Sequence, residues 1–254
     1  MSKPVAGTQS LARAVDVLQL VADASEPPTL AALQAQTDLT RATLHRLLSS
    51  LTQLGLLEHG TDKAYRPGMR LVTLARKALS ESDIRRLARG ALVELRDITG
   101  ETVHLAVPFE NGMAYIDKIE SSQVVRMNST IGTIVAFHST AVGKAFLSKL
   151  PEDKARALID AHPKAQFTEF TSTETADILS KVRTARDEGY VFDDQENEVG
   201  ISCFGAAIQD EDGQPIAAIS ISVPLFRLRT DHEFYAEPLR RAVRVLSAQG
   251  GFAA

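Results

Sequence analysis

The stretch 29–57, TLAALQAQTDLTRATLHRLLSSLTQLGLL, has its apolar residues at helical spacing. Leucines at i, i+3, i+4 and i+7 form one apolar stripe in its second half: Leu44, Leu47, Leu48 and Leu51. Three more leucines brace a shorter helix before it: Leu30, Leu33 and Leu39. The chain must turn at Thr37-Asp38, and the hydroxyl of Thr40 can cap the second helix. The pattern predicts two short helices joined by a tight turn.

The second helix presents short or basic side chains on the face opposite the leucines. A helix held by one apolar face and fronted by Arg and His suits the DNA major groove, which is about as wide as a helix. We expect DNA contacts from Thr40, Arg41, Ala42, Thr43, His45, Arg46 and Ser49. An ordinary packed helix pair with solvated charges is the alternative interpretation of this stretch alone.

Residues 56–67, LLEHGTDKAYRP, predict a short β-hairpin with a turn-rich tip at 60–63. A helix-turn-helix followed at once by such a hairpin is a winged arrangement. The wing adds phosphate contacts beside the groove. Its candidate DNA contacts are Lys63, Tyr65 and Arg66.

Amphipathic helices are expected on both sides of this unit. One covers 11–24, with Ser10 as its cap, and another covers 70–79 after the turn at Pro67-Gly68. A polar link at 80–83 precedes a strongly periodic helix, 84–98, that ends at Gly100. These patterns divide the chain into a DNA-binding domain (1–75), a stiff helical linker (76–90) and a second domain (91–254).

Beyond Gly100 the pattern changes to strands. TVHLAVPF and MAYIDKIE flank Asn111-Gly112, the preferred pair for a two-residue reversal, and VVRM (124–127) follows as a short strand. Further strands are expected at 190–192, 202–209 and 216–223, with helices at 141–150, 152–161, 175–188 and 234–246. Grouped strands with intervening helices indicate an α+β domain with an antiparallel sheet flanked by helices.

Charge is unevenly distributed along the 254 residues. The net charge is −4, but residues 1–80 hold nine Lys/Arg against six Asp/Glu, and the remaining 174 hold nineteen against twenty-six. A mildly basic head on an acidic body fits DNA contact limited to one end. The single cysteine, Cys203, excludes an internal disulfide framework and a Cys-rich zinc site. Without a signal-like apolar segment at the N-terminus, the protein is expected to be cytoplasmic.

Motifs along nearly the whole chain resemble the IclR family of bacterial transcriptional regulators. They are SLARAVDVLQLVA, LTRATLHRLLSSLTQLGLL, YRPGMRLVTLA, TGETVHLAV, YIDKIES, VRM, FHSTAVGKAFLSKLP, GYVFDDQENEVGISC and AAISISVP. The resemblance implies a winged helix-turn-helix followed by a GAF-like effector-binding domain. It also implies dimers or dimers of dimers that read short palindromic DNA operators and respond to a small metabolite. Asp38 stands where the family usually has Gly, so we expect a small strain in the turn.

The second domain contains residues suited to bind a small anion. The backbone N–H groups of Ala141, Val142 and Gly143 begin a predicted helix, where the helix dipole favours a carboxylate. Ser220 and Ser222 alternate with branched apolar residues and so share one face of a strand. The family resemblance places small-acid ligands against Val135, Ala141, Val142, Asp193, Cys203, Ser220 and Ser222.

Each of these residues also has a structural interpretation. The serines suit a solvated strand face, Cys203 a small buried hydrophobe, Asp193 a solvent-facing or capping carboxylate, and His138 a structural histidine. An enzyme using Cys203, His138 and Asp193 as nucleophile, base and orienting group is the alternative function. However, Cys203 begins a strand and lacks the electropositive helix start that activates cysteines.

No cofactor is expected, and His104, His138, Asp193 and Cys203 lack the spacing of metal ligands. The polar set suits a compact carboxylate effector such as a keto or hydroxy acid. An aromatic acid is the runner-up, because aromatic and large apolar side chains can line a larger cavity: Phe109, Met113, Tyr115 and Phe137. A sensory module without DNA contact is the third possibility.

Overall fold

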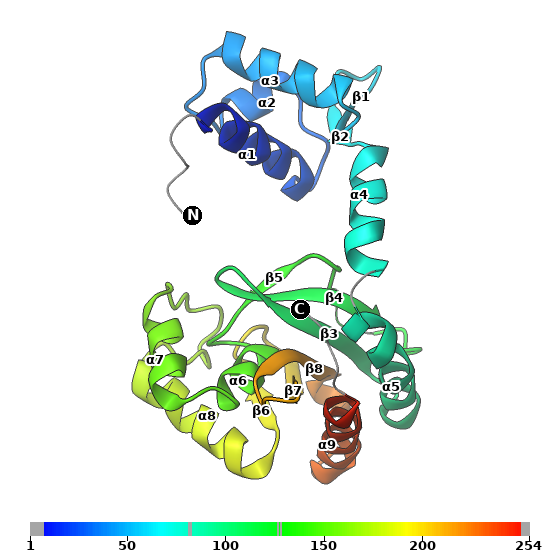
Figure 1. Cartoon of the computed structure of the whole chain (residues 1–254), viewed down its shortest axis with the longest axis vertical. Coiled ribbons are helices and arrows are strands. Elements are labelled where there is room, and N and C mark those ends of the chain that lie inside the picture. Colours follow the sequence, from blue (N-terminus) through cyan, green and yellow to red (C-terminus); the bar gives the residue numbers. More distant parts are fainter. Residues whose placement is uncertain (1–7, 81–82, 126, 128, 250–254) are drawn as a thin grey trace. The chain divides into compact units, whose positions relative to one another are not determined.

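The computed structural model describes residues 8–80, 83–125, 127 and 129–249, which form two compact units. Unit 1 comprises residues 1–81 and unit 2 residues 82–254, and Figure 1 labels the elements of each. The division falls inside the stretch predicted as a linker, of which residues 81 and 82 lie outside the described residues. No helix within the described residues is long and apolar enough to cross a membrane.

Unit 1 is a small helical bundle that carries one β-hairpin. Its elements are α1 (Gln9–Asp23), α2 (Leu30–Gln34), α3 (Arg41–Gln53), β1 (Leu57–His59), β2 (Tyr65–Pro67) and α4 (Met69–Ser80). The core joins α1, α2, α3 and the hairpin through Val17, Val21, Leu33, Leu44, Leu48, Leu51, Leu57 and Tyr65. The predicted leucine stripe therefore faces this core, as the helical spacing requires.

The ends of the helices test the predicted caps and the turn. The Thr43 N–H donates to the Thr40 hydroxyl at 3.3 Å, which confirms the predicted cap of α3. The predicted cap at Ser10 is wrong, because α1 begins at Gln9 and has no side-chain cap. The strain expected at Asp38 is also absent, since its φ is not positive.

Unit 2 contains a six-stranded antiparallel sheet in the order β5-β4-β3-β8-β7-β6. The strands are β3 (Thr102–Phe109), β4 (Gly112–Ile119), β5 (Ile134–Ala136), β6 (Val191–Asp194), β7 (Ile201–Gln209) and β8 (Pro215–Pro224). The helices are α5 (Asp83–Thr99), α6 (Ala141–Ser148), α7 (Glu152–Asp160), α8 (Thr175–Glu188) and α9 (Glu233–Ala248), with a 3-10 turn η1 (Leu225–Arg227) before α9.

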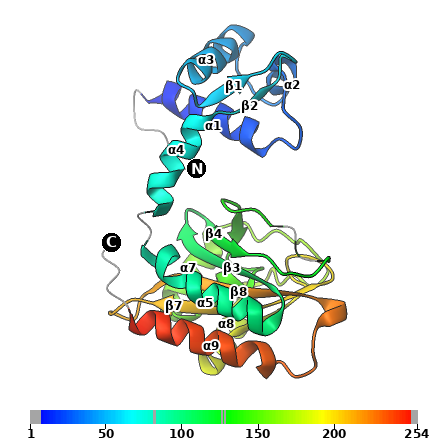
Figure 2. The same cartoon turned by 90° about the vertical axis from the view of Figure 1, so that its right-hand side faces the viewer.

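Alternation along the central strands separates two apolar layers. Ile219, Ile221 and Val223 of β8 face a core with α5 and α9, which lie side by side over the sheet in Figure 2. Ala218 faces the other core, which contains α6, α7 and α8. Ser220 and Ser222 alternate with the branched residues and point to this second side. The predicted α+β architecture is confirmed.

Three details of the sheet differ from the sequence prediction. VVRM forms no strand in its described part, and Arg126 lies outside the described residues. The strand β5 was not expected. The β3–β4 reversal uses Glu110 and Asn111, with Glu110 at φ 45°, so Gly112 begins β4. Gly112 is needed for another reason, because a Cβ there would lie 2.2 Å from the Val135 carbonyl oxygen of β5.

Candidate DNA-binding surface and effector pocket

Helix α3 leaves its predicted DNA-binding side chains accessible. Thr40, Arg41, Ala42, His45, Arg46 and Ser49 are exposed and Thr43 is half-buried, while Leu44 and Leu48 beneath them are fully buried. Neither Arg41 nor Arg46 forms an ion pair with any residue in the described part of the chain. The face therefore presents cationic side chains that are free to meet phosphates and base edges.

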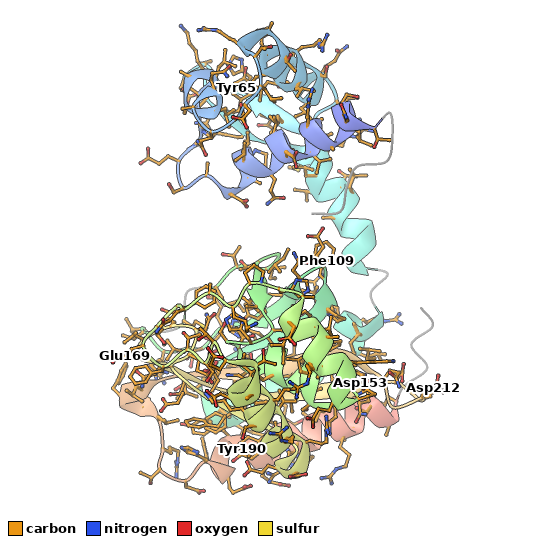
Figure 3. The ribbon with its side chains drawn as sticks, turned by 90° about the vertical axis from the view of Figure 1, so that its left-hand side faces the viewer. Tyr65, Phe109, Asp153, Glu169, Tyr190 and Asp212 are labelled. Carbon is orange, nitrogen blue, oxygen red and sulfur yellow. The ribbon has the colours of Figure 1, made fainter. Side chains whose placement is uncertain are left out.

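The wing contains only part of the predicted contact set. Lys63 is exposed at the hairpin tip, and Arg66 is half-buried in an ion pair with Asp62 at 2.5 Å. A hydrogen bond from Arg66 lowers the pKa of Asp62 to about 2, so the two side chains form a charged pair at the surface of the hairpin. Tyr65 is buried in the core of unit 1 and stacks on His59, so its assignment to the DNA-facing surface is wrong (Figure 3).

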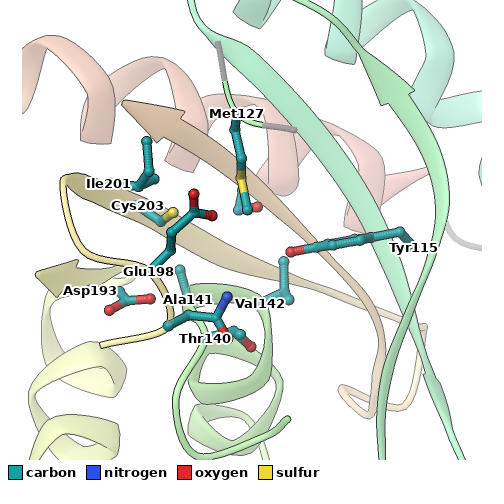
Figure 4. Close-up of a pocket in the computed structure, with 11 residues that line it drawn as sticks. Tyr115, Met127, Thr140, Ala141, Val142, Asp193, Glu198, Ile201 and Cys203 are labelled. Atoms are coloured by element: carbon teal, nitrogen blue, oxygen red, sulfur yellow. The ribbon is translucent and has the colours of Figure 1, made fainter. Parts of the chain in front are cut away.

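Unit 2 contains a small pocket at the start of α6 that is partly open to solvent. Figure 4 shows its lining, with Tyr115 and Asp193 at opposite sides. Five of the predicted effector contacts line it: Ala141, Val142, Asp193, Cys203 and Ser220. Five further lining residues were not predicted from the sequence: Met127, Thr140, Asn197, Glu198 and Ile201.

The start of α6 is held close to the sheet by two glycines. A Cβ on Gly205 of β7 would lie 2.5 Å from the Ala141 carbonyl oxygen, and one on Gly143 would lie 2.5 Å from Phe137. The Gly143 N–H donates to the Thr140 hydroxyl at 3.2 Å, so it is not unpaired as expected. The N–H groups of Ala141 and Val142 have no partner in the described part of the chain and remain for a ligand.

The serines of β8 are both buried, which rules out the solvated-strand interpretation. Ser220 lines the pocket directly. Ser222 lies one step behind it, accepting a hydrogen bond from the Cys203 thiol at 3.4 Å. Val135 is on β5, paired with Met113, and does not line the pocket.

A network of buried charged side chains lies beside the pocket and includes its wall residue Asp193. The Lys144 side chain, 0% exposed, forms an ion pair with Glu196, and its Nζ lies 3.9 Å from Asp193 Oδ1. Lys181 reaches Glu196 from α8 at 3.0 Å. Burial raises the pKa of Asp193 to about 6 despite Lys144, whereas the two lysines outweigh the effect of burial and lower the pKa of Glu196. Neither Lys144 nor Glu196 was predicted to be part of the site, although Lys144 is the one charged residue in the apolar helix AVGKAFLS.

The proposed catalytic set is not assembled. His138 Nε2 lies 3.0 Å from the Ala165 carbonyl oxygen, and His138 does not line the pocket that contains Cys203 and Asp193. Burial raises the pKa of Cys203 to about 12, so the thiol is protonated and unreactive at neutral pH. Within the described residues, no three His, Cys, Asp or Glu side chains are grouped to hold a metal.

Comparison with known proteins agrees with this arrangement. Residues 76–248 match the family model "Bacterial transcriptional regulator IclR C-terminal", and residues 10–60 match the "IclR helix-turn-helix domain". The chain belongs to the IclR family. The regulator XynR of Escherichia coli is 31% identical to it over 97% of this chain and 98% of its own length.

Solved IclR-family structures share the fold across both units. The IclR of Thermotoga maritima has a TM-score of 0.78 at 28% identity, covering 96% of this chain and all of that one. An IclR homologue of Microbacterium hydrocarbonoxydans, solved with 4-hydroxybenzoate, has a TM-score of 0.81 at 24% identity, covering 94% and 98%. The protein is thus a DNA-binding transcriptional regulator with a C-terminal ligand-binding domain, and it is not an enzyme.

Proposed function

We propose that this regulator binds a palindromic operator through α3, and that a compact organic acid in the unit 2 pocket modulates that binding. The observation that carries the effector assignment is the free N–H pair of Ala141 and Val142 at the pocket. Two adjacent backbone donors at a helix start form an anion site, and the helix dipole adds to the attraction.

The pocket walls favour a compact acid over an aromatic one. Of the four side chains expected to line a larger cavity, only Tyr115 lines the pocket. Met113 and Phe137 are buried in the core, and Phe109 is 51% exposed at the end of β3. The other wall residues include Ser220 and Asn197, which can hydrogen-bond the oxygens of a small acid, together with the apolar Met127 and Ile201.

Arg41 and Arg46 of α3, which form no ion pair with the residues that the structure describes, support the operator-binding part of the proposal. Recognition helices of this type act in pairs, and a two-fold symmetric protein reads a two-fold symmetric site. We infer a homodimer or a dimer of dimers as the operator-binding species. The helical segments around residues 76–90 would carry the effector signal from one unit to the other.

The double variant Ser220→Ala/Ser222→Ala tests the pocket. It removes two hydroxyls from one face of β8, one lining the pocket and one holding Cys203. We expect operator binding to persist in a gel-shift assay while the release or enhancement caused by an organic acid disappears. Ser180→Ala, at an exposed position on α8, serves as the matched control. An unchanged response to the acid in the double variant would remove the pocket assignment.

A further inference from the structure

Two carboxylates line the effector pocket in addition to its backbone donors. Asp193 lies in β6, and Glu198 lies on the segment that joins β6 to β7. The Asp193 Oδ1 atom accepts the Glu196 N–H at 3.0 Å and lies 3.9 Å from the Lys144 ammonium. The Glu198 carboxylate forms no hydrogen bond or ion pair with any residue that the structure describes. It is exposed and borders the pocket beside Cys203 (Figure 4).

An ionised carboxylate accepts hydrogen bonds and cannot donate them. A ligand that covers Glu198 removes water from its oxygens, and a charge left without a hydrogen-bond partner is costly. Among the described residues no side chain donates to Glu198, and the Thr140 hydroxyl in the same pocket already donates to the Ala136 carbonyl oxygen. A donor group on the ligand would supply the missing hydrogen bond.

We propose that the effector is an acid that also carries a hydrogen-bond donor, a hydroxyl or an ammonium group, and that Glu198 selects for it. This inference rests on the proposed function, in which the ligand carboxylate binds the Ala141 and Val142 N–H groups. The donor group of the ligand meets Glu198, which lines the same pocket and accepts its hydrogen. A keto acid of the same skeleton presents only acceptors to Glu198 and is disfavoured.

The direction of selection follows from the chemistry of polar sites. A site built to hydrogen-bond a ligand hydroxyl rejects an analogue without it, because a polar group of the protein is then left unpaired. A hydrogen bond to a charged acceptor is stronger than one to a neutral acceptor. We expect a preference on the order of tenfold or more for the donor-bearing acid.

Calorimetry on the full-length protein at pH 7.5 tests the proposal with acids matched in skeleton. One series comprises propionate, pyruvate, lactate and alanine, and a second comprises benzoate and 4-hydroxybenzoate. We expect lactate or alanine to bind about tenfold more tightly than pyruvate and propionate, with the tighter of the two identifying the donor as hydroxyl or ammonium. In the aromatic pair, a donor preference would show the same rule in a larger ligand.

Glu198→Ala assigns the preference to its residue. This variant is expected to bind lactate and pyruvate within about twofold of each other, while Glu169→Gln, at an exposed carboxylate outside the pocket, keeps the parent preference. Equal binding of donor-bearing and donor-free acids by the parent would overturn the inference and leave the proposed function standing. A preference that survives in Glu198→Ala and vanishes in Asp193→Asn would also overturn it. If no acid of either series binds the parent, the proposed function fails as well.

Discussion

The two units place their functional groups in opposite ways. On α3 of unit 1, Arg41 and Arg46 project from the fold, and the buried Leu44 and Leu48 do the structural work on the other face. In unit 2, Asp193 and Ser220 are buried, and the pocket is made from residues that also hold the domain together. In unit 1, different residues therefore carry binding and folding stability, whereas in unit 2 the same residues contribute to both.

This contrast follows from the size and charge of the ligand. DNA is a large polyanion that meets a surface, so its contacts need only exposed donors on a rigid support. A small acid must be surrounded, so its pocket is built into the interior of the domain. Lys144 and Glu196 show what this requires, since they place opposite charges beneath the pocket with no exposure to water.

The largest expected effect tests the independence of the DNA-binding face. Arg41→Ala and Arg46→Ala should each weaken operator binding by about 1–3 kcal/mol, and together by a hundredfold or more. The free energy of unfolding should change by less than about 0.5 kcal/mol per substitution, because both side chains are exposed. DNase footprinting and circular dichroism measure the two quantities. Arg13→Ala, exposed on α1, is the matched control, and a footprint unchanged in the double variant would show that α3 does not read the operator.

The next effect tests whether the residues around the pocket also stabilise the fold of unit 2. Lys144→Met should lower the free energy of unfolding of unit 2 by about 3 kcal/mol, because it leaves the buried Glu196 without its closest cation. Adding Glu196→Gln should restore part of this loss. Urea unfolding followed by circular dichroism suits a chain that contains no tryptophan. Lys154→Met, exposed on α7, is the control, and a Lys144→Met protein as stable as this control would contradict the role of the network.

A smaller effect on the free energy of unfolding should appear when the pH is changed. Burial raises the pKa of Asp193 from 3.8 to about 6, so the folded state holds this proton more tightly than the unfolded state. That contribution to stability is present at low pH and is lost as the pH rises from about 4 through 6.

Effector affinity should follow the same titration. Protonation of Asp193 removes its repulsion of a carboxylate ligand. The ligand should therefore bind up to about tenfold more tightly at pH 5 than at pH 7.5. Calorimetry in a buffer free of carboxylates measures this ratio, and Asp193→Asn should flatten it. Affinity that does not vary with pH in the parent would place the ligand away from Asp193.

The smallest effect concerns Thr40, which caps α3 and is also a predicted DNA contact. Thr40→Ala should cost about 1 kcal/mol of stability in unit 1, because the Thr43 N–H loses its acceptor. Thr40→Ser keeps the hydroxyl and should keep the stability. Thermal unfolding of the two variants checks the difference. Equal melting temperatures would show that the cap contributes little to the folded state.

Periodicity predicted most of the architecture, because burial enforces it on the elements that pack against a core. The helical spacing of Leu44, Leu48 and Leu51 and the alternation of Ser220 and Ser222 both correspond to faces that the structure buries. Five of the seven expected effector contacts line one pocket, although they come from four separate stretches of the chain. The resemblance to a family supplied that grouping, since spacing alone does not bring β6, β7, β8 and the start of α6 together.

The failures occur where tertiary contact overrides local pattern. Tyr65 resembled a surface residue because it lies between basic neighbours, yet strand alternation turns its ring into the core. Strand β5 has a half-exposed edge without clear alternation, and only its pairing with β4 defines it. Glu196 lies in an acidic run of the kind that is usually solvated, and the partner that buries it, Lys144, is 52 residues away.

The contacts of Gly143 and Gly205 determine how a displacement at the occupied pocket reaches other parts of unit 2. At both glycines, backbone meets backbone with no side chain between them that can change rotamer and absorb a displacement. Any shift of Ala141 toward a bound acid must therefore be taken up by the β7 main chain itself. Strand β7 also packs against α9. A displacement at the pocket would therefore be transmitted through β7 to the opposite face of the sheet.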